Sequence, residues 1–175
     1  MSVITLDEAK NYLRVDGADD NALITAFIEA AKDQVEKFTS RTLLTQTFEL
    51  IYDAVGDSIE IVKSPLQEVT KIETISDAGV KTEVSSSTYV VDISGSRGRV
   101  RLKDGCVWPT HRGFASFIIT AKAGYGENAI DVPVLLRTAV FIALAIIYQE
   151  RGAIDEGKIV SSISAICWPY KVIRL

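Results

Sequence analysis

The chain has 175 residues, of which 47% are hydrophobic and 24% are charged, so it can bury a core as one domain or as a helical body with a strand-rich lobe. Its net charge of −4 argues against a general nucleic-acid binder, because duplex binding depends on clustered cationic contacts with phosphate groups. The N-terminus shows no basic flank followed by an apolar stretch, and the two cysteines lack the close spacing of a zinc or redox pair, so we expect synthesis in the cytoplasm with reduced thiols.

Two helices are predicted in residues 4–43. Thr5 and Glu8 have the spacing of a capping box, in which the hydroxyl accepts a hydrogen bond from the first turn and the carboxylate accepts one from the Thr5 backbone. An Asp-Gly turn should end this helix near Val15, and one of the aspartates that follow it can cap a second helix. The hydrophobic residues of the second helix keep to one face: Leu23, Ile24, Phe27, Ala31, Val35 and Phe38.

After the second helix the pattern changes to short runs in which hydrophobic and polar residues alternate. Such runs are typical of half-buried strands, and the turns between them, which contain Gly and Asp, favour antiparallel hairpins in a small sheet or barrel. We expect strands in residues 47–52, 58–62, 69–75, 89–93, 99–102 and 117–121.

One of these predicted strands carries a basic residue at every second position, from Arg97 through Arg99 and Arg101 to Lys103. Because side chains alternate across a strand, the four cations should share one face. That face could contact DNA or an acidic partner. Residues 1–40 of a second copy are one such acidic partner, since they contain eight acidic and four basic side chains. The alternative is a solvated strand face, or a sheet edge that its charges guard against pairing.

A third helix is predicted by a nearly continuous hydrophobic run in residues 132–148, and Gly152 should end it. The run is shorter than the roughly 20 residues of a membrane-spanning helix and contains Arg137, so we expect burial in protein and no membrane contact. A helix this hydrophobic needs partners on most of its circumference, which predicts packing against the N-terminal helices and against a second copy of the chain. Three small residues would permit close approach of a helix from that copy: Ala139, Ala143 and Ala145.

The last segment, residues 154–175, is too apolar for a solvated tail. We expect an extended C-terminal arm that docks on its own subunit, on a neighbouring copy or on another protein. The candidate contact residues of this arm are Trp168, Tyr170, Val172, Ile173 and Arg174.

The sequence contains no convincing catalytic, metal-binding or cofactor-binding set. His111 is the only histidine and has no cluster of cysteines or carboxylates near it in the sequence, and no serine lies in a nucleophile-elbow sequence. The aspartates that follow the first helix fit helix capping better than a calcium loop, because the Gly and Glu positions of that loop are missing. We therefore predict a protein that is not an enzyme and that uses no cofactor.

Four segments, in chain order, read TLDEAKNYLRVD, EAAKDQVEKFTSRTL, SPLQEVTKI and AGYGENAIDVPVLLRTAVFIALAIIYQERGA. In this order and spacing they resemble the head-tail connector (adaptor) proteins of tailed phages, which sit beneath the portal of the capsid. The resemblance spans residues 4–153, and its specificity comes from the series of features, since no single motif is diagnostic.

The resemblance and the hydrophobic pattern together imply an α+β fold. Residues 1–44 and 131–153 would form one helical module that packs as a bundle, with a β-rich insertion in residues 45–130. Residues 154–175 would then be the C-terminal arm.

The resemblance further implies a structural virion protein that forms a ring of about twelve copies at the head-tail interface, after synthesis in the host cytoplasm. The ring would bind the portal and a stopper or tail protein, and packaged DNA would pass through its channel without sequence-specific binding. The basic face would line the channel or contact a neighbouring subunit, and the arm would contact the portal. The alternatives are a stopper or tail-completion ring protein and a small-ligand-binding protein.

Overall fold

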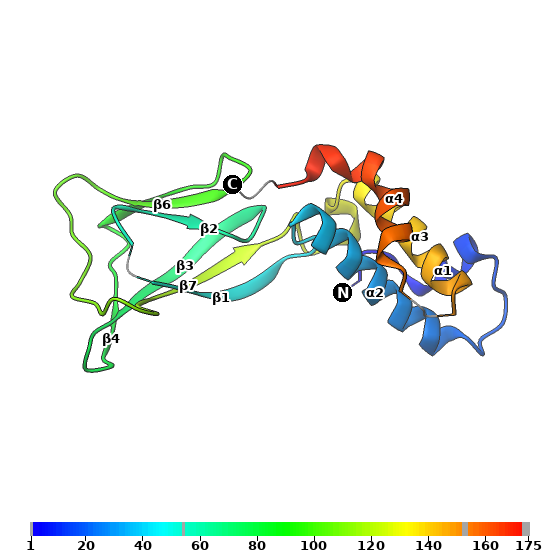
Figure 1. The fold of residues 1–175 in the computed structure, drawn as a ribbon, viewed down its shortest axis with the longest axis horizontal. Helices are drawn as coiled ribbons and strands as arrows, with labels where there is room; N and C mark the ends of the chain where they lie inside the picture. The colour runs from blue at the N-terminus through cyan, green and yellow to red at the C-terminus, as the bar shows by residue number, and fades with distance from the viewer. Residues whose placement is uncertain (1, 54, 152–153, 173–175) are drawn as a thin grey trace. The chain divides into compact units, whose positions relative to one another are not determined.

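The structure, a computed structural model, describes residues 2–53, 55–151 and 154–172. The chain divides into two compact units (Figure 1). The helical unit contains both ends of the chain, Met1–Leu44 and Tyr125–Leu175, and the β unit contains the intervening Thr45–Gly124. The described residues form α-helices and antiparallel sheets, which confirms the predicted α+β fold.

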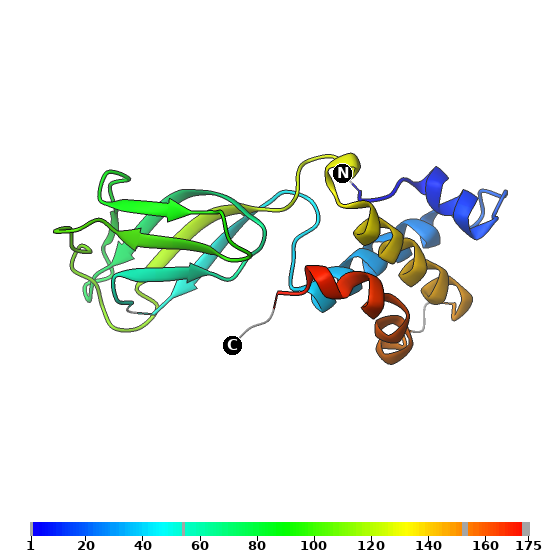
Figure 2. The same ribbon diagram turned by 90° about the horizontal axis from the view of Figure 1, so that it is seen from above.

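The helical unit is a bundle of helices from both ends of the chain. Helices α2 and α3 pack side by side, and α1 and α4 each pack against this pair. Figure 2 shows α3 in front of α2. The helices are α1 (Leu6–Leu13), α2 (Asn21–Thr39), α3 (Val134–Gln149) and α4 (Glu156–Cys167), with short 3-10 helices at η1 (Ala129–Asp131) and η2 (Trp168–Tyr170).

The capping box predicted at the start of α1 is present. Glu8 N donates to Thr5 Oγ1 at 3.1 Å, and Thr5 N donates to Glu8 Oε2 at 2.8 Å. The other oxygen of Glu8 accepts from Arg137 Nη2 of α3 at 2.9 Å, and Arg137 Nε donates to the Val3 carbonyl at 3.2 Å. The hydrogen bonds from the Thr5 backbone, the Thr5 hydroxyl and Arg137 lower the pKa of Glu8 below its ordinary value. The only charged side chain of α3 therefore holds α1 and the N-terminal segment in place.

The core of the helical unit lies where α2, α3 and α4 meet. On each helix the buried residues follow the three- and four-residue spacing of one helical face. They include Ile24, Phe27, Ile28, Ala31 and Val35 of α2, Leu136, Ala139, Val140, Ala143, Leu144 and Ile147 of α3, and Ile159, Ile163 and Cys167 of α4.

The C-terminal segment is not the extended arm expected from the sequence. Glu156–Cys167 form α4, and the carboxylate of Asp155 caps its first turn. Ile159, Ile163 and Cys167 recur at every fourth position, so one face of α4 is hydrophobic and packs into the bundle core. The free energy gained by burying this face favours a helix over an extended arm.

Residues beyond α4 are tied to the end of α2. Val172 N donates to the Thr39 carbonyl at 2.9 Å, and Arg41 Nε donates to the Tyr170 carbonyl at 2.5 Å. The Val172 side chain is buried. The end of the described chain is thus part of the helical unit. Three residues named in the sequence analysis lie outside the described ranges: Gly152, Ile173 and Arg174.

The β unit packs two antiparallel sheets around one core. The four-stranded sheet has the order β1-β7-β3-β4, and the three-stranded sheet has the order β2-β6-β5. Buried side chains of both sheets form one cluster that includes Ile72, Val100 and Phe117. The strands are β1 (Gln46–Tyr52), β2 (Ser58–Ile61), β3 (Leu66–Ile75), β4 (Lys81–Glu83), β5 (Tyr89–Asp92), β6 (Gly98–Leu102) and β7 (Phe117–Ala123).

The sheets approach closely at the start of β6. A Cβ atom on Gly98 would lie 2.8 Å from the Cβ of Leu66, which is closer than packed side chains come. Glycine at this position therefore lets β6 pass against β3.

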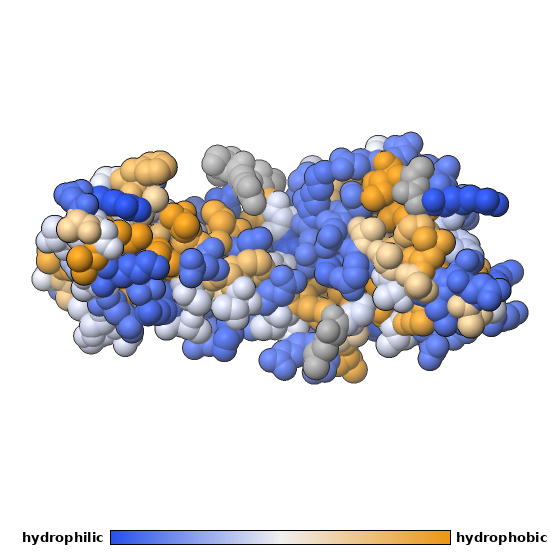
Figure 3. All heavy atoms as spheres, turned by 90° about the horizontal axis from the view of Figure 1, so that it is seen from below, coloured by the Kyte–Doolittle hydropathy of each residue, from blue (hydrophilic) through white to orange (hydrophobic). Residues whose placement is uncertain are grey.

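Both units expose hydrophobic residues, which Figure 3 shows as separate patches among hydrophilic ones. No helix in the described ranges is long and apolar enough to cross a membrane. The large exposed hydrophobic residues include Tyr12, Leu23, Val134, Leu135 and Trp168 on the helical unit and Ile51, Val62, Val80 and Phe114 on the β unit.

The packing of α4 predicts the effect of shortening a side chain on its buried face. Ile163→Ala should lower the free energy of unfolding by about 2–5 kcal/mol, because it leaves a cavity in the core. Urea unfolding followed by far-UV circular dichroism measures this change. The matched control is Ser162→Ala on the exposed face, which should change the free energy by less than about 0.5 kcal/mol. Equal effects of the two substitutions would contradict the packing of α4.

Candidate functional site

The basic strand predicted from the sequence is β6, in the middle of the three-stranded sheet. Its side chains alternate as expected, with Val100 and Leu102 buried and with Arg99 and Arg101 exposed. The exposed pair therefore lies on the outer face of this sheet. Across the neighbouring strands, Arg99 faces Glu60 and Asp92, whereas Arg101 faces Ser58 and Val90.

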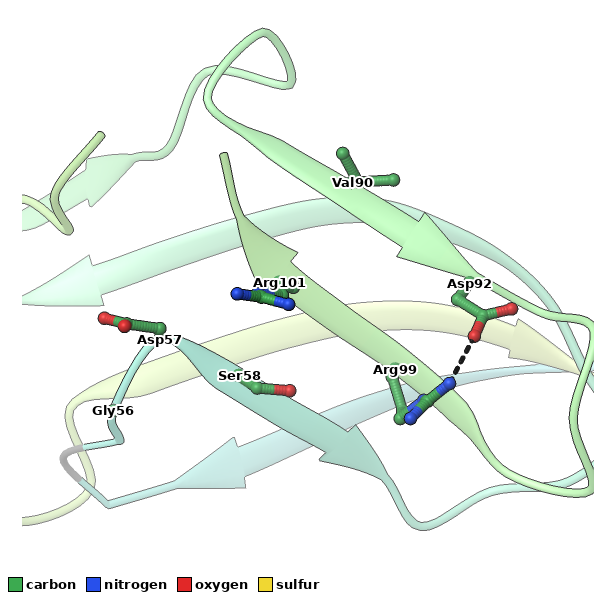
Figure 4. Close-up of a pocket in the computed structure, with 7 residues that line it drawn as sticks. All are labelled: Gly56, Asp57, Ser58, Val90, Asp92, Arg99 and Arg101. Carbon is green, nitrogen blue, oxygen red and sulfur yellow. Dashed lines mark hydrogen bonds and ion pairs between the residues drawn. The ribbon is translucent and has the colours of Figure 1, made fainter. Parts of the chain in front are cut away.

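Acidic residues on the neighbouring strands pair with two of the four cations. Arg97 Nη1 forms an ion pair with Glu60. Arg99 Nη2 donates to Asp92 Oδ2 at 2.7 Å, as Figure 4 shows. Hydrogen bonds from Ser94 and from Arg99 hold the pKa of Asp92 well below its usual range, so this carboxylate stays charged at neutral pH. Two positive charges of the predicted basic face are thus locally balanced.

The other two cations have no ion pair within the part of the chain that the structure describes. Lys103 Nζ donates to the Ser87 carbonyl at 2.7 Å. Arg101 points over the outer face beside Asp57 and Val90 (Figure 4). A surface hollow of about 680 Å³ surrounds it, lined by Gly56, Asp57, Ser58, Val90, Asp92, Arg99 and Arg101. The hollow presents both positive and negative side chains. Such a mixture fits a polar protein partner better than it fits DNA, which favours a surface of uniformly positive charge.

The predicted contact residues of the C-terminal arm differ in their availability. The Trp168 side chain is 61% exposed, whereas Val172 is buried and Tyr170 is half-buried. Ile173 and Arg174 lie outside the described residues. Among the described residues of this group, Trp168 is therefore the one that presents a large surface to a partner.

The three alanines predicted to meet a neighbouring copy do not share an exposed face. Ala139 and Ala143 are fully buried in the core of their own subunit, and Ala145 is half-buried. The first two leave no side-chain surface for a neighbour. The small side chains do serve close packing, but the partners are helices of the same chain.

The opposite side of α3 carries a surface of which the sequence analysis singled out only Ala145. Val134 and Leu135 are exposed at its first turn, and the same side continues through Thr138 and Ile142 to Ala145. We refer to these five residues as the outer strip of α3. The sequence does indicate a second hydrophobic surface, because α3 is hydrophobic on nearly every side. Periodicity alone could not tell which side the subunit buries and which side it exposes.

His111 and Cys167, two residue types that often perform chemistry, each lie in a structural setting in the described chain. His111 Nδ1 lies 2.8 Å from the Pro109 carbonyl, and its ring packs against Phe117 with a centroid distance of 4.8 Å. Burial raises the pKa of the Cys167 thiol to about 11, so it is protonated at neutral pH. Within the described residues, no group of three His, Cys, Asp or Glu side chains could hold a metal ion.

Solved structures of gene transfer agent (GTA) particles contain chains with a similar fold. A chain from the neck of an empty GTA particle, computed with C6 symmetry, is 24% identical with a TM-score of 0.80, and the match covers 99% of this chain and 91% of that chain. A chain from the virion of a native GTA particle is also 24% identical, with a TM-score of 0.81 and the same coverage. A chain from the neck of a native GTA particle, computed with C12 symmetry, is 24% identical with a TM-score of 0.76, covering 97% of this chain and 89% of that chain.

The sequence gives the family. Curated proteins include none that matches the chain significantly. The family of phage gp6-like head-tail connector proteins, however, matches residues 3–99, which contain α1, α2 and strands β1 to β5. This match covers more than half of the chain and confirms the resemblance seen in the sequence. The chain therefore belongs to the phage gp6-like head-tail connector protein family.

Proposed function

We propose that this protein is a head-tail connector subunit of a virion, which assembles with copies of itself into a ring beneath the portal. The observation that carries the proposal is the family match over residues 3–99. The fold supports it, because it matches chains from the necks of GTA particles over nearly the whole chain. The role is structural: the ring extends the DNA channel and presents a surface for a stopper or tail protein.

The ring itself is supported by the symmetry of the similar neck structures, which were computed with C6 and C12 symmetry. In a closed ring each subunit contacts one neighbour through one surface and the other neighbour through a different surface. We propose a ring of about twelve copies, made in the host cytoplasm and located at the head-tail interface of the particle.

In this ring, Arg101 and Lys103 on the outer face of the three-stranded sheet would form a contact surface. With Arg97 and Arg99 paired to acids on their own sheet, the remaining cations can meet either packaged DNA in the channel or the acidic N-terminal segment of a neighbour. Their contribution would be to orientation and association rate more than to affinity.

The proposal is tested by mixing the purified protein with the portal protein of the same particle. Native mass spectrometry should detect complexes that carry a fixed number of copies, about twelve for each portal. The protein alone provides the control for rings that form without a template. A protein that binds a tail component and ignores the portal would indicate a stopper or tail-completion protein instead, and a monomer that ignores both would contradict the proposal.

The exposed tryptophan after α4 is the proposed portal contact. Trp168→Ala should weaken portal binding roughly 30-fold or more, because a large aromatic side chain at the centre of a protein interface contributes about 2 kcal/mol or more. The matched control is Phe114→Ala, which removes an even more exposed aromatic side chain from the β unit. Titration of immobilised portal measures both affinities. Equal affinities of the two variants, with intact circular dichroism spectra, would remove Trp168 from the interface.

Replacement of Arg101 by serine tests the basic face. Arg101→Ser should leave the melting temperature unchanged, because no ion pair holds this side chain within the described residues. It should reduce either the salt dependence of ring assembly or the retention of packaged DNA, and the affected property identifies the partner. If ring assembly, its salt dependence and DNA retention all match the unmodified protein, the face is merely solvated.

A further inference from the structure

We propose that the outer strip of α3 is the surface against which a neighbouring copy of this chain packs in the ring. This inference rests on the proposed function, in which copies of the chain form a closed ring. It identifies one of the two surfaces through which each subunit contacts its neighbours. The strip consists of Val134, Leu135, Thr138, Ile142 and Ala145.

The spacing of these residues places them on one side of the helix. At roughly 100° per residue, positions 134, 138, 142 and 145 follow one another along three turns, with position 135 beside them. Leu136, Ala139, Val140, Ala143 and Ile147 lie on the opposite side and are buried in the core. The helix therefore has two hydrophobic sides, and its own subunit buries one of them.

No charge interrupts the strip. Arg137 is the only charged residue of α3, and its side chain turns away to Glu8 and to the Val3 carbonyl. The one polar member, Thr138, donates its hydroxyl to the Val134 carbonyl at 2.9 Å within the helix. Its methyl group and the small Ala145 side chain would allow a partner to approach closely. Charge depletion of this kind is typical of the centre of a protein interface.

Two further exposed hydrophobic residues lie next to α3, one in the chain and one in space. Ile130 of η1, directly before the helix, is among the most exposed hydrophobic residues of the described chain. Tyr12 of α1 is half exposed and packs against Phe141 of α3 with a ring-centroid distance of 5.0 Å. In Figure 2, no described segment of the helical unit passes in front of α3. Solvent would cover this surface in an isolated subunit, which is unfavourable for a patch of this composition.

A second copy of the chain fits this surface better than the other partners of a connector. DNA is a polyanion and gains nothing from an uncharged strip, whereas the cations Arg101 and Lys103 lie on the β unit. In a ring with cyclic symmetry each subunit has a permanent neighbour on either side, and permanent contacts are the more hydrophobic ones. Because a ring of more than two copies uses heterologous contacts, the strip meets a different surface of that neighbour.

The test is an acidic double substitution at the start of the strip, Val134→Glu with Leu135→Glu. Acidic residues in the first turn interact favourably with the helix dipole, so the monomer should fold normally. The matched control is Val80→Glu with Val62→Glu, which makes the same change of charge at exposed valines of the β unit. Circular dichroism and melting temperature verify the folding of both variants.

Native mass spectrometry with the portal then separates ring closure from portal binding. The strip variant should reduce the fraction of portals that carry a complete ring roughly tenfold while single copies still bind, and the control should fill the ring. Complete rings of the strip variant at unmodified yield would overturn the inference. Loss of single-copy binding would also overturn it, because the strip would then be a portal contact. If the unmodified protein forms no ring on the portal, the proposed function itself fails, independently of the strip.

A photo-reactive residue in place of Ile142 identifies the partner directly in assembled particles. We expect cross-linked peptides that join Ile142 to another copy of this chain. Cross-links to portal or tail peptides alone would contradict the inference.

Discussion

The helical unit depends on the burial of α3, whose sixteen residues include a single charged side chain. Helices from the two ends of the chain cover one side of it, α1 and α2 from the N-terminus and α4 from the C-terminus. Arg137 does not disturb this arrangement, because Glu8 and the Val3 carbonyl bind it at the edge of the core. The β unit can therefore be a long insertion between α2 and α3 without dividing the bundle.

In the proposed ring the same helix links folding to assembly. The subunit offers enough helices to bury about half of the circumference of α3, and the outer strip remains for another molecule. In the proposed ring that molecule is a copy of the same chain, so one side of α3 specifies the bundle and the other side its neighbour. Under this proposal the contact between copies comes from hydrophobic surface that the monomer leaves uncovered, and it needs no separate binding motif.

The β unit shows how tertiary pairing changes the meaning of a charge pattern. Alternation along β6 placed its arginines on one face, as the sequence predicted. The partners of those arginines came from β2 and β5, whose order in the sheet is not encoded in the spacing of the basic residues. Glu60 and Asp92 pair with Arg97 and Arg99, so a stripe of four positive charges became a mixed surface.

Local pattern in the sequence determined the α+β class, the capping box at Thr5, the alternation of the strands and the need to bury α3, because helical and strand periodicity are properties of neighbouring residues. The segment 154–175 was predicted to be an extended arm because it is too apolar for a solvated tail, although Ile159, Ile163 and Cys167 keep helical spacing. Only the tertiary structure decided that Ala139 and Ala143 face their own core, that Val172 packs on α2, and that Arg99 is paired. Each of these depends on which distant segment supplies the partner, and periodicity along one helix or strand does not specify that partner.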